Sequence, residues 1–137
     1  MNVTNVGRIA YFAGLTDGEG YIQLMDDGKG YIKLAVRISL TDGAEVLDEM
    51  QELWGGSLHI RNRPGMRPYT EWLIYTKQAE TCLRELLPFL KIKREEANLA
   101  LKYRDMQNSW GRKLIGSSER KKRAEIEKRL KQLHNPT

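Results

Sequence analysis

The chain has 137 residues, of which 40% are apolar and 30% charged, a composition that predicts one compact domain and argues against wholesale disorder. No stretch approaches the roughly 18 apolar residues that a membrane-spanning helix needs, so we expect no membrane association. The first residues lack the basic and apolar blocks of a signal peptide. A single cysteine, Cys82, excludes an internal disulfide framework and a cysteine-based zinc site. We therefore expect an intracellular protein of a reducing compartment.

Charge is distributed unevenly along the chain, whose formal net charge is +5. Residues 1–90 contain 9 Lys and Arg against 12 Asp and Glu, a balance of −3, whereas residues 91–137 contain 14 against 6, a balance of +8. A basic segment of this kind is typical of proteins that contact a polyanion such as nucleic acid. On charge alone, a solvated, charge-rich helix explains the segment equally well.

The first part of the sequence predicts a helix followed by a hairpin. Residues 6–17 fit a helix with Thr4 or Asn5 as its N-cap, and Gly18 is placed to end it in a left-handed conformation. Alternating patterns over residues 21–25 and 31–40, separated by a turn rich in Gly and Asp, predict two antiparallel strands. The second strand has an apolar inward face, and its outward face carries Tyr31, Lys33, Ala35, Arg37 and Ser39.

The same order recurs in the middle of the chain. A helix over about 43–54 precedes a strand over 57–63, a turn around Pro64 and Gly65, and a strand over about 69–76. Two hairpins with cationic outer faces suggest a sheet that lies on nucleic acid, although a single strand of this kind indicates only a solvated face. We expect the inward side chains to be Leu58, Ile60, Trp72 and Ile74, and the outward ones His59, Arg61 and Arg63.

The remaining sequence predicts helices. Residues 77–87 fit a helix stopped by Pro88, and residues 92–109 fit another, with Ile92 on its apolar face. A final charged helix over 118–133 has only a sparse apolar stripe, so it buries little surface and is expected to order only on a partner. That stripe consists of Ala124, Ile126, Leu130 and Leu133.

The segment that carries the chemistry is Tyr11–Gly20, with the sequence YFAGLTDGEG. Ala13 and Gly14 lack bulk, so another backbone can approach the helix closely there. Asp17 and Glu19 lie where the helix ends, and the negative end of the helix dipole disfavours a carboxylate. A cation, either a metal ion or a lysine, is therefore expected beside them.

This segment resembles the LAGLIDADG motif of homing endonucleases. The predicted order of helices and hairpins is that of the family and covers nearly the whole chain, and Phe89–Lys93 followed by Ala97–Leu99 resembles the family's segment with an active-site lysine. The resemblance implies a mixed α/β (α+β) fold of helix–hairpin–helix–hairpin–helix type, with a concave antiparallel DNA-binding sheet. It places the endonuclease domain at residues 1–110 and a basic helical extension at residues 111–137.

The resemblance also implies roles for matching residues. Glu19, with Gly18 beside it, matches the position that binds a divalent metal next to the scissile phosphate. Asp17 matches the first acid of the motif, which we interpret as mainly structural within the catalytic set, and Lys93 matches the lysine near the reacting phosphate. Leu40 stands where the family often has a polar residue that helps to position water. The expected metal is Mg²⁺ or another divalent cation such as Mn²⁺, with Ca²⁺ as a non-catalytic substitute, and no small-molecule cofactor is implied.

A single motif implies a homodimer on a near-palindromic site in double-stranded DNA, inside a microbe, a phage-infected cell or an organelle. The expected dimer interface consists of Phe12, Ala13, Gly14 and Thr16. The expected contacts from the sheet to DNA are Gln23, Tyr31, Lys33, Arg37, Ser39, His59, Arg61 and Arg63. The expected contacts to the flanking backbone are Arg112, Lys113, Arg120, Lys121, Lys122 and Arg123.

Three functions remain open from the sequence. The first is a site-specific, metal-dependent endonuclease that hydrolyses phosphodiester bonds of DNA, which Glu19 and Lys93 favour. The second is a catalytically inactive DNA-binding regulator or RNA-splicing maturase on the same fold, which Leu40 favours slightly. The third is a small interaction domain whose basic tail binds an acidic protein, and this leaves the cationic hairpins and the acidic helix end unexplained.

Overall fold

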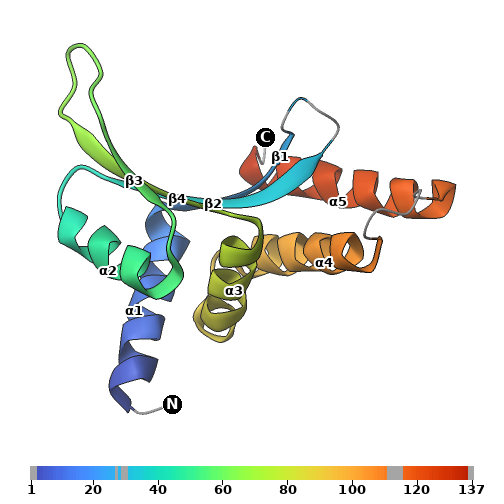
Figure 1. Ribbon diagram of the computed structural model, residues 1–137, viewed down its shortest axis with the longest axis horizontal. Helices are drawn as coiled ribbons and strands as arrows, with labels where there is room; N and C mark the ends of the chain where they lie inside the picture. The colour runs from blue at the N-terminus through green and yellow to red at the C-terminus, as the bar shows by residue number, and fades with distance from the viewer. Residues whose placement is uncertain (1–2, 27, 29–30, 111–115, 136–137) are drawn as a thin grey trace.

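The computed structural model describes residues 3–26, 28, 31–110 and 116–135. The expected α+β fold and its order of helices and hairpins are confirmed (Figure 1). The elements in chain order are α1 (Val3–Glu19), β1 (Gly20–Asp26), β2 (Ile32–Leu40), α2 (Ala44–Trp54), β3 (Ser57–Arg61), β4 (Tyr69–Tyr75), α3 (Thr76–Leu86), the short 3-10 helix η1 (Leu87–Phe89), α4 (Arg94–Trp110) and α5 (Ser117–His134).

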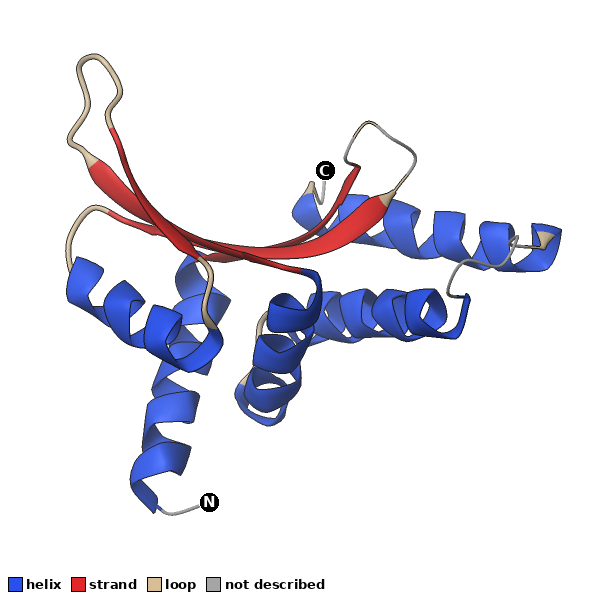
Figure 2. Ribbon diagram, in the orientation of Figure 1, coloured by secondary structure: helices blue, strands red, loops and turns tan. Residues whose placement is uncertain are grey.

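The four strands form one antiparallel sheet with the order β1-β2-β4-β3. Helices α1 to α4 lie against one face, which we call the inner face, and the other, outer face is open and curved (Figures 1 and 2). The register pairs Tyr21 with Arg37, and Glu71 with both Ser39 and His59. Because side chains alternate along a strand, the odd-numbered positions share the outer face.

The core lies between the inner face of the sheet and the helices. Trp72 and Ile74 of β4 are fully buried, as are Leu47 of α2 and Leu83 of α3, which belong to the same apolar cluster. Each such side chain contributes about 1.5–3 kcal/mol of burial free energy. The indole Nε1–H of Trp72 donates to the Gly55 carbonyl at 2.9 Å, so its polar atom is satisfied.

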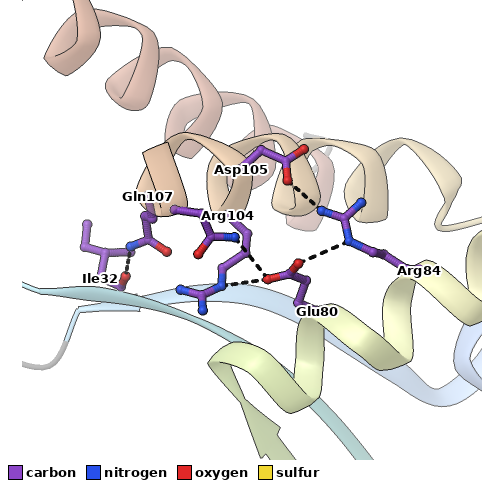
Figure 3. A network of polar contacts seen from close by, with 7 residues as sticks. Ile32, Glu80, Arg84, Arg104, Asp105 and Gln107 are labelled. Carbon is purple, nitrogen blue, oxygen red and sulfur yellow. Dashed lines mark hydrogen bonds and ion pairs between the residues drawn. The ribbon is translucent and has the colours of Figure 1, made fainter. Parts of the chain in front are cut away.

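A polar network joins α3 to α4 on the helical side (Figure 3). The Glu80 carboxylate accepts hydrogen bonds from Arg104 at 2.9 Å, Arg84 at 3.2 Å and Asn108 at 3.4 Å, and Arg84 also donates to Asp105 at 2.6 Å. Burial acts to raise the pKa of Glu80, but the hydrogen bonds from Arg104 and Arg84 outweigh it and hold the pKa below its ordinary value. The network fixes the angle at which α4 leaves the core.

Helix α5 packs on its own chain. Ile126 and Leu130 are buried and form a small apolar cluster with Tyr103 of α4. Leu24 of β1 and Ile32 of β2 pack against the same cluster, so α5 lies beside the first hairpin (Figure 1). Two residues of the sparse stripe therefore pack against the helix's own chain. In the described part of the chain, no helix combines the length and apolar character needed to span a membrane.

Some expected boundaries were wrong, and one side chain on the inner face is not covered by the core. α1 begins at Val3 and continues through Gly18, so neither Thr4 nor Asn5 precedes it as an N-cap and Gly18 does not end it. Ile60 is 73% exposed because it lies toward the far end of edge strand β3, where the helices do not cover the sheet.

Other differences follow from where elements end. Ile92 is 75% exposed and precedes α4, because the backbone of residues 91–93 is held in a bend rather than a helical turn. Arg63 lies in the turn after β3, which ends at Arg61. Ala124 is exposed on α5.

Candidate active site and nucleic-acid interface

Glu19 is the last residue of α1, at the junction of that helix with the sheet. Gly20 begins β1 directly, with no connecting loop. A Cβ atom on Gly20 would lie 2.6 Å from the Thr16 carbonyl oxygen, so only glycine allows the chain to pass at once from helix to strand. The direct passage from α1 to β1 therefore places the exposed side chain of Glu19 at the edge of the sheet.

Asp17, two residues earlier, is engaged by the backbone before α4. Its Oδ2 accepts the Lys91 N–H at 2.9 Å, and its Oδ1 accepts the N–H groups of Ile92 at 3.1 Å and Lys93 at 2.9 Å. These three amides belong to the bend that precedes α4 at Arg94. Asp17 is 8% exposed, and its carboxylate ties the end of α1 to the segment that leads into α4.

Lys93 supplies the cation that the helix end requires. Its Nζ donates to the Asp17 carbonyl oxygen at 2.7 Å, at the negative end of α1. Its own carbonyl accepts the Ala97 N–H at 2.9 Å, which starts the hydrogen-bond ladder of α4. The LAGLIDADG-like motif and the second segment singled out in the sequence thus meet, 76 residues apart along the chain.

A concavity opens on the outer face beside Glu19. Arg37 and Arg63 bring positive charge to it, while the carboxylates of Asp42 and Glu71 already have partners: Arg67 donates to Asp42 at 2.8 Å and Arg61 to Glu71 at 3.3 Å. Among the described residues, no hydrogen bond or ion pair engages the Glu19 carboxylate. The concavity is lined by Glu19, Arg37, Ser39, Leu40, Thr41, Asp42, Arg63, Met66, Tyr69 and Glu71.

Three outer-face cations lie over tyrosine rings. This arrangement restrains a flexible side chain while leaving its hydrogen-bond donors free for a ligand. The distances to the ring centroids are 4.1 Å from Lys33 Nζ to Tyr75, 5.2 Å from Arg37 Cζ to Tyr21 and 5.4 Å from Arg63 Cζ to Tyr69. Tyr31, His59 and Arg61 are exposed, and Gln23 and Ser39 are partly exposed.

The cations of α5 that were expected at DNA differ in their partners. Arg120, Lys121 and Lys122 are exposed, and Lys122 Nζ lies 3.7 Å from the Glu119 carboxylate. Arg123 pairs with Glu127 at 3.3 Å, and its guanidinium lies over the ring of Tyr103 at 5.5 Å, so it helps to hold α5 against α4. Arg112 and Lys113 lie outside the described residues.

The structure corrects the expected dimer interface. Phe12, Ala13 and Thr16 are buried in the protein's own core, because they lie on the face of α1 that packs beneath the sheet. Gly14 faces outward. The exposed side of α1 carries Gly7, Tyr11, Gly14 and Gly18, and no atom lies within 4 Å of a Cβ built on any of the three glycines.

Asp42 and Glu71 were missed by the sequence analysis. Glu71 occupies an outward position next to inward Trp72, so the alternation of the strand was a signal for it. Asp42 follows β2 in a loop, and only the pairing of β2 with β4 brings it near Arg67. Leu40 itself is partly buried against the core but also lines the concavity, together with the polar Ser39, Thr41 and Asp42.

The residues present fit a divalent cation that is shared with a substrate. Carboxylate oxygen is the donor that Mg²⁺ prefers, and Mg²⁺ is commonly held by one or two carboxylates together with phosphate oxygens and water. Glu19 offers one exposed, unengaged carboxylate. The described residues contain no cluster of three or more His, Cys, Asp or Glu that could hold a metal ion on its own.

The chain was compared with known proteins. No model of a known family matches it. It is 31% identical to the DNA endonuclease I-CreI of Chlamydomonas reinhardtii over 102 aligned positions, and the match covers 69% of this chain and 60% of that relative. The matched part is thus less than two thirds of the relative's length.

Solved structures share the fold. The homing endonuclease I-CvuI, bound to DNA in the presence of Mg, superposes with a TM-score of 0.77 over 98% of this chain and 86% of that chain, at 20% identity. I-CvuI was also solved with its own target in the presence of Ca. The archaeal intron-encoded homing endonuclease I-Vdi141I, complexed with DNA, gives a TM-score of 0.72 over 94% of this chain and 85% of that chain, at 13% identity. In its motif, its fold and its sequence match, the chain is similar to the LAGLIDADG homing endonucleases.

Proposed function

We propose that the protein is a site-specific homing endonuclease that hydrolyses phosphodiester bonds of double-stranded DNA. The observation that carries the proposal is Glu19: an exposed carboxylate at the end of the motif helix, without a partner among the described residues, at a concavity that also holds Arg37 and Arg63. A carboxylate needs a compensating cation beside a phosphate, and the arginines attract the phosphate itself.

Glu19 is the residue that would hold Mg²⁺, with the adjacent Gly18 carbonyl as a further oxygen donor. The bound cation supplies neutralisation of charge on the phosphoryl oxygens. Arg37 and Arg63 bind and orient the DNA backbone or bases, because their guanidinium donors remain available above tyrosine rings. Lys93, fixed on Asp17, keeps the end of α1 and thus Glu19 in place.

We propose that the working unit is a homodimer. One chain offers one such carboxylate, and cutting two strands calls for two. The exposed face of α1 around Gly7, Gly14 and Gly18 allows the backbone of a second α1 to approach closely, and Tyr11 on the same side adds apolar area that is 59% exposed in the single chain. A two-fold dimer reads a near-palindromic site.

The sheet is the surface proposed to lie on DNA. Its outer face presents the cations, amide, hydroxyl and imidazole groups that read base edges and phosphates. The exposed basic residues of α5 extend this surface to the flanking DNA backbone. Because the proposed substrate is DNA, we expect the protein to act inside a cell or organelle. A DNA-binding regulator or maturase on the same scaffold is the second candidate, which the missing polar residue at Leu40 favours.

A single experiment separates the two candidates. The protein is incubated with a large DNA library with Mg²⁺ or EDTA, and new ends and retained molecules are both sequenced. Recurrent staggered double-strand breaks that depend on Mg²⁺ and centre on a near-palindrome support the endonuclease.

Selective retention of library members without breaks assigns the protein to the binding class. A library of concatenated random sequence, several times larger than the number of sites of the expected length, provides the control for a rare target. Breaks that also form in EDTA would contradict the metal dependence.

A further inference from the structure

The C-terminal end of α5 makes its most specific contact with the outer face of the sheet. His134, the last residue of the helix, lies against the ring of Tyr21 with centroids 4.4 Å apart. Its Nε2 is 2.7 Å from the Ile22 carbonyl oxygen, and its Nδ1 is 3.2 Å from the Tyr21 hydroxyl. α5 lies beside β1 in Figure 1.

The chemistry of these atoms sets the direction of each hydrogen bond. A carbonyl oxygen can only accept, so Nε2–H of His134 donates to Ile22. In the neutral imidazole Nδ1 is then an acceptor, and the Tyr21 hydroxyl donates to it. Glu96 of α4 also lies 3.8 Å from Nε2. With His134 side-chain exposure of 12%, the ring is held on several sides and its position is well defined.

Tyr21 is at the same time the platform for a DNA-facing arginine. It is the direct cross-strand partner of Arg37 on the outer face, and the Arg37 guanidinium lies over its ring at 5.2 Å. Arg37 lines the concavity that contains Glu19, whereas Tyr21 and His134 line a second hollow between β1 and α5. The pair therefore joins the end of α5 to the site.

We propose that His134 is a positioning residue for DNA recognition: through the ring of Tyr21 it fixes the guanidinium of Arg37, so that the seating of α5 sets the base or phosphate that Arg37 selects. A guanidinium held in one orientation loses less conformational freedom when it binds, and its paired donors discriminate better between partners. The inference rests on the proposed DNA-binding function.

The first test uses the free protein and no DNA. In an NMR spectrum of the arginine Nε–Hε groups, Arg37, identified by its disappearance in Arg37→Lys, shows an upfield ring-current shift from Tyr21. His134→Ala moves this resonance toward the positions of solvated arginines, and Tyr21→Leu moves it as far or farther. Gln132→Ala, an exposed change two residues away on α5, leaves it in place.

The second test measures selectivity. DNA molecules retained by the wild type and the variants in Ca²⁺ are sequenced, and base preference is calculated for each position. Arg37→Ala lowers the base preference at the positions that Arg37 contacts by about 5- to 100-fold, which is the range for one paired contact to a base. His134→Ala weakens preference at those same positions, His134→Gln restores part of it by donating to Ile22, and the double variant is no worse than Arg37→Ala alone.

The outcomes separate this inference from the proposed function. If the DNA retained by the wild type shows no sequence preference, the proposed DNA recognition is overturned. The NMR result still decides whether His134 positions Arg37. An unchanged Arg37 resonance in His134→Ala, or a uniform loss of affinity without a change in preference, overturns the inference and assigns His134 to stability alone.

Discussion

Lys93 and Asp17 are joined by two hydrogen bonds, and each of the two residues contributes its backbone to one of them. The Lys93 amide donates to Asp17 Oδ1 at 2.9 Å, and the Lys93 Nζ donates to the Asp17 carbonyl at 2.7 Å. The negative end of α1 and the amide-rich start of α4 are thereby neutralised by one pair of residues. Because Glu19 follows Asp17 by two residues, the pair also sets where the proposed metal-holding carboxylate stands.

Removing the Asp17 carboxylate is expected to destabilise the protein. Asp17→Ala leaves three partly buried amides without this acceptor and lowers the free energy of unfolding by on the order of 2–4 kcal/mol. Asp17→Asn keeps one acceptor oxygen and loses less. Urea denaturation of both variants measures the difference, and a midpoint for Asp17→Ala equal to that of the wild type would contradict the role of Asp17 in joining α1 to α4.

Filling the exposed face of α1 is expected to prevent dimerisation without unfolding the chain. In Gly14→Leu the new side chain enters open space, and leucine favours a helix over glycine by up to about 0.8 kcal/mol, so the monomer keeps its circular dichroism spectrum. Sedimentation velocity then shows monomers where the wild type shows dimers. Ala124→Leu, on exposed α5, is the control and stays dimeric. A dimer of unchanged strength in Gly14→Leu places the interface elsewhere.

The exposed basic residues of α5 are expected to contribute to salt-dependent DNA binding. If Arg120 and Lys121 each neutralise a phosphate, changing both to Gln lowers the slope of log affinity against log salt by about two. Affinity for all sequences falls together, because backbone contacts carry no sequence information. Arg123→Gln is the matched control, since Arg123 pairs with Glu127 and should alter stability rather than the slope. An unchanged slope in the double variant removes α5 from the DNA surface.

The network around Glu80 predicts a pH-dependent stability. The pKa of Glu80 in the folded protein lies below the ordinary 4.5, so its contribution is present above that pH and is lost as the pH falls through the folded value. Glu80→Gln is expected to reduce the free energy of unfolding by roughly 1–3 kcal/mol at pH 7. The gap between wild type and variant closes below pH 4.5.

Thermal and urea unfolding across this pH range provide the measurement for Glu80. Glu125→Gln, an exposed carboxylate on α5, serves as the control and shows no gap at any pH. If the difference in the free energy of unfolding between the wild type and Glu80→Gln persists unchanged at low pH, Glu80 acts through its shape and not through its charge.

Much of the fold could be predicted from the sequence because strand alternation is a local signal. The inward positions of Trp72 and Ile74, and the outward positions of Lys33 and Arg37, follow from a period of two. Ile60 also lies on the inner face by this rule but is exposed, since whether a helix covers the far end of β3 is decided by tertiary packing.

The site could be predicted only as far as its motifs reach. The YFAGLTDGEG segment points to Glu19, Asp17 and, with the second segment, Lys93, but it does not tell which side of α1 is free. Phe12, Ala13 and Thr16 were therefore assigned outward although they are buried. The contact of His134 with Tyr21 joins residues 113 positions apart and has no local signature at all.

Glu19→Gln tests the proposed metal-holding role of Glu19 once a target site has been recovered. The variant has nearly the shape of the wild type and lacks only the charge, at an exposed position, so its stability is expected to be unchanged. The measurement is the rate of strand cleavage in Mg²⁺ together with the affinity for the same DNA. We predict that cleavage is abolished while affinity stays within a few-fold of the wild type. Cleavage at the wild-type rate would contradict the proposed role of Glu19, and so would a loss of binding that accompanies the loss of cleavage.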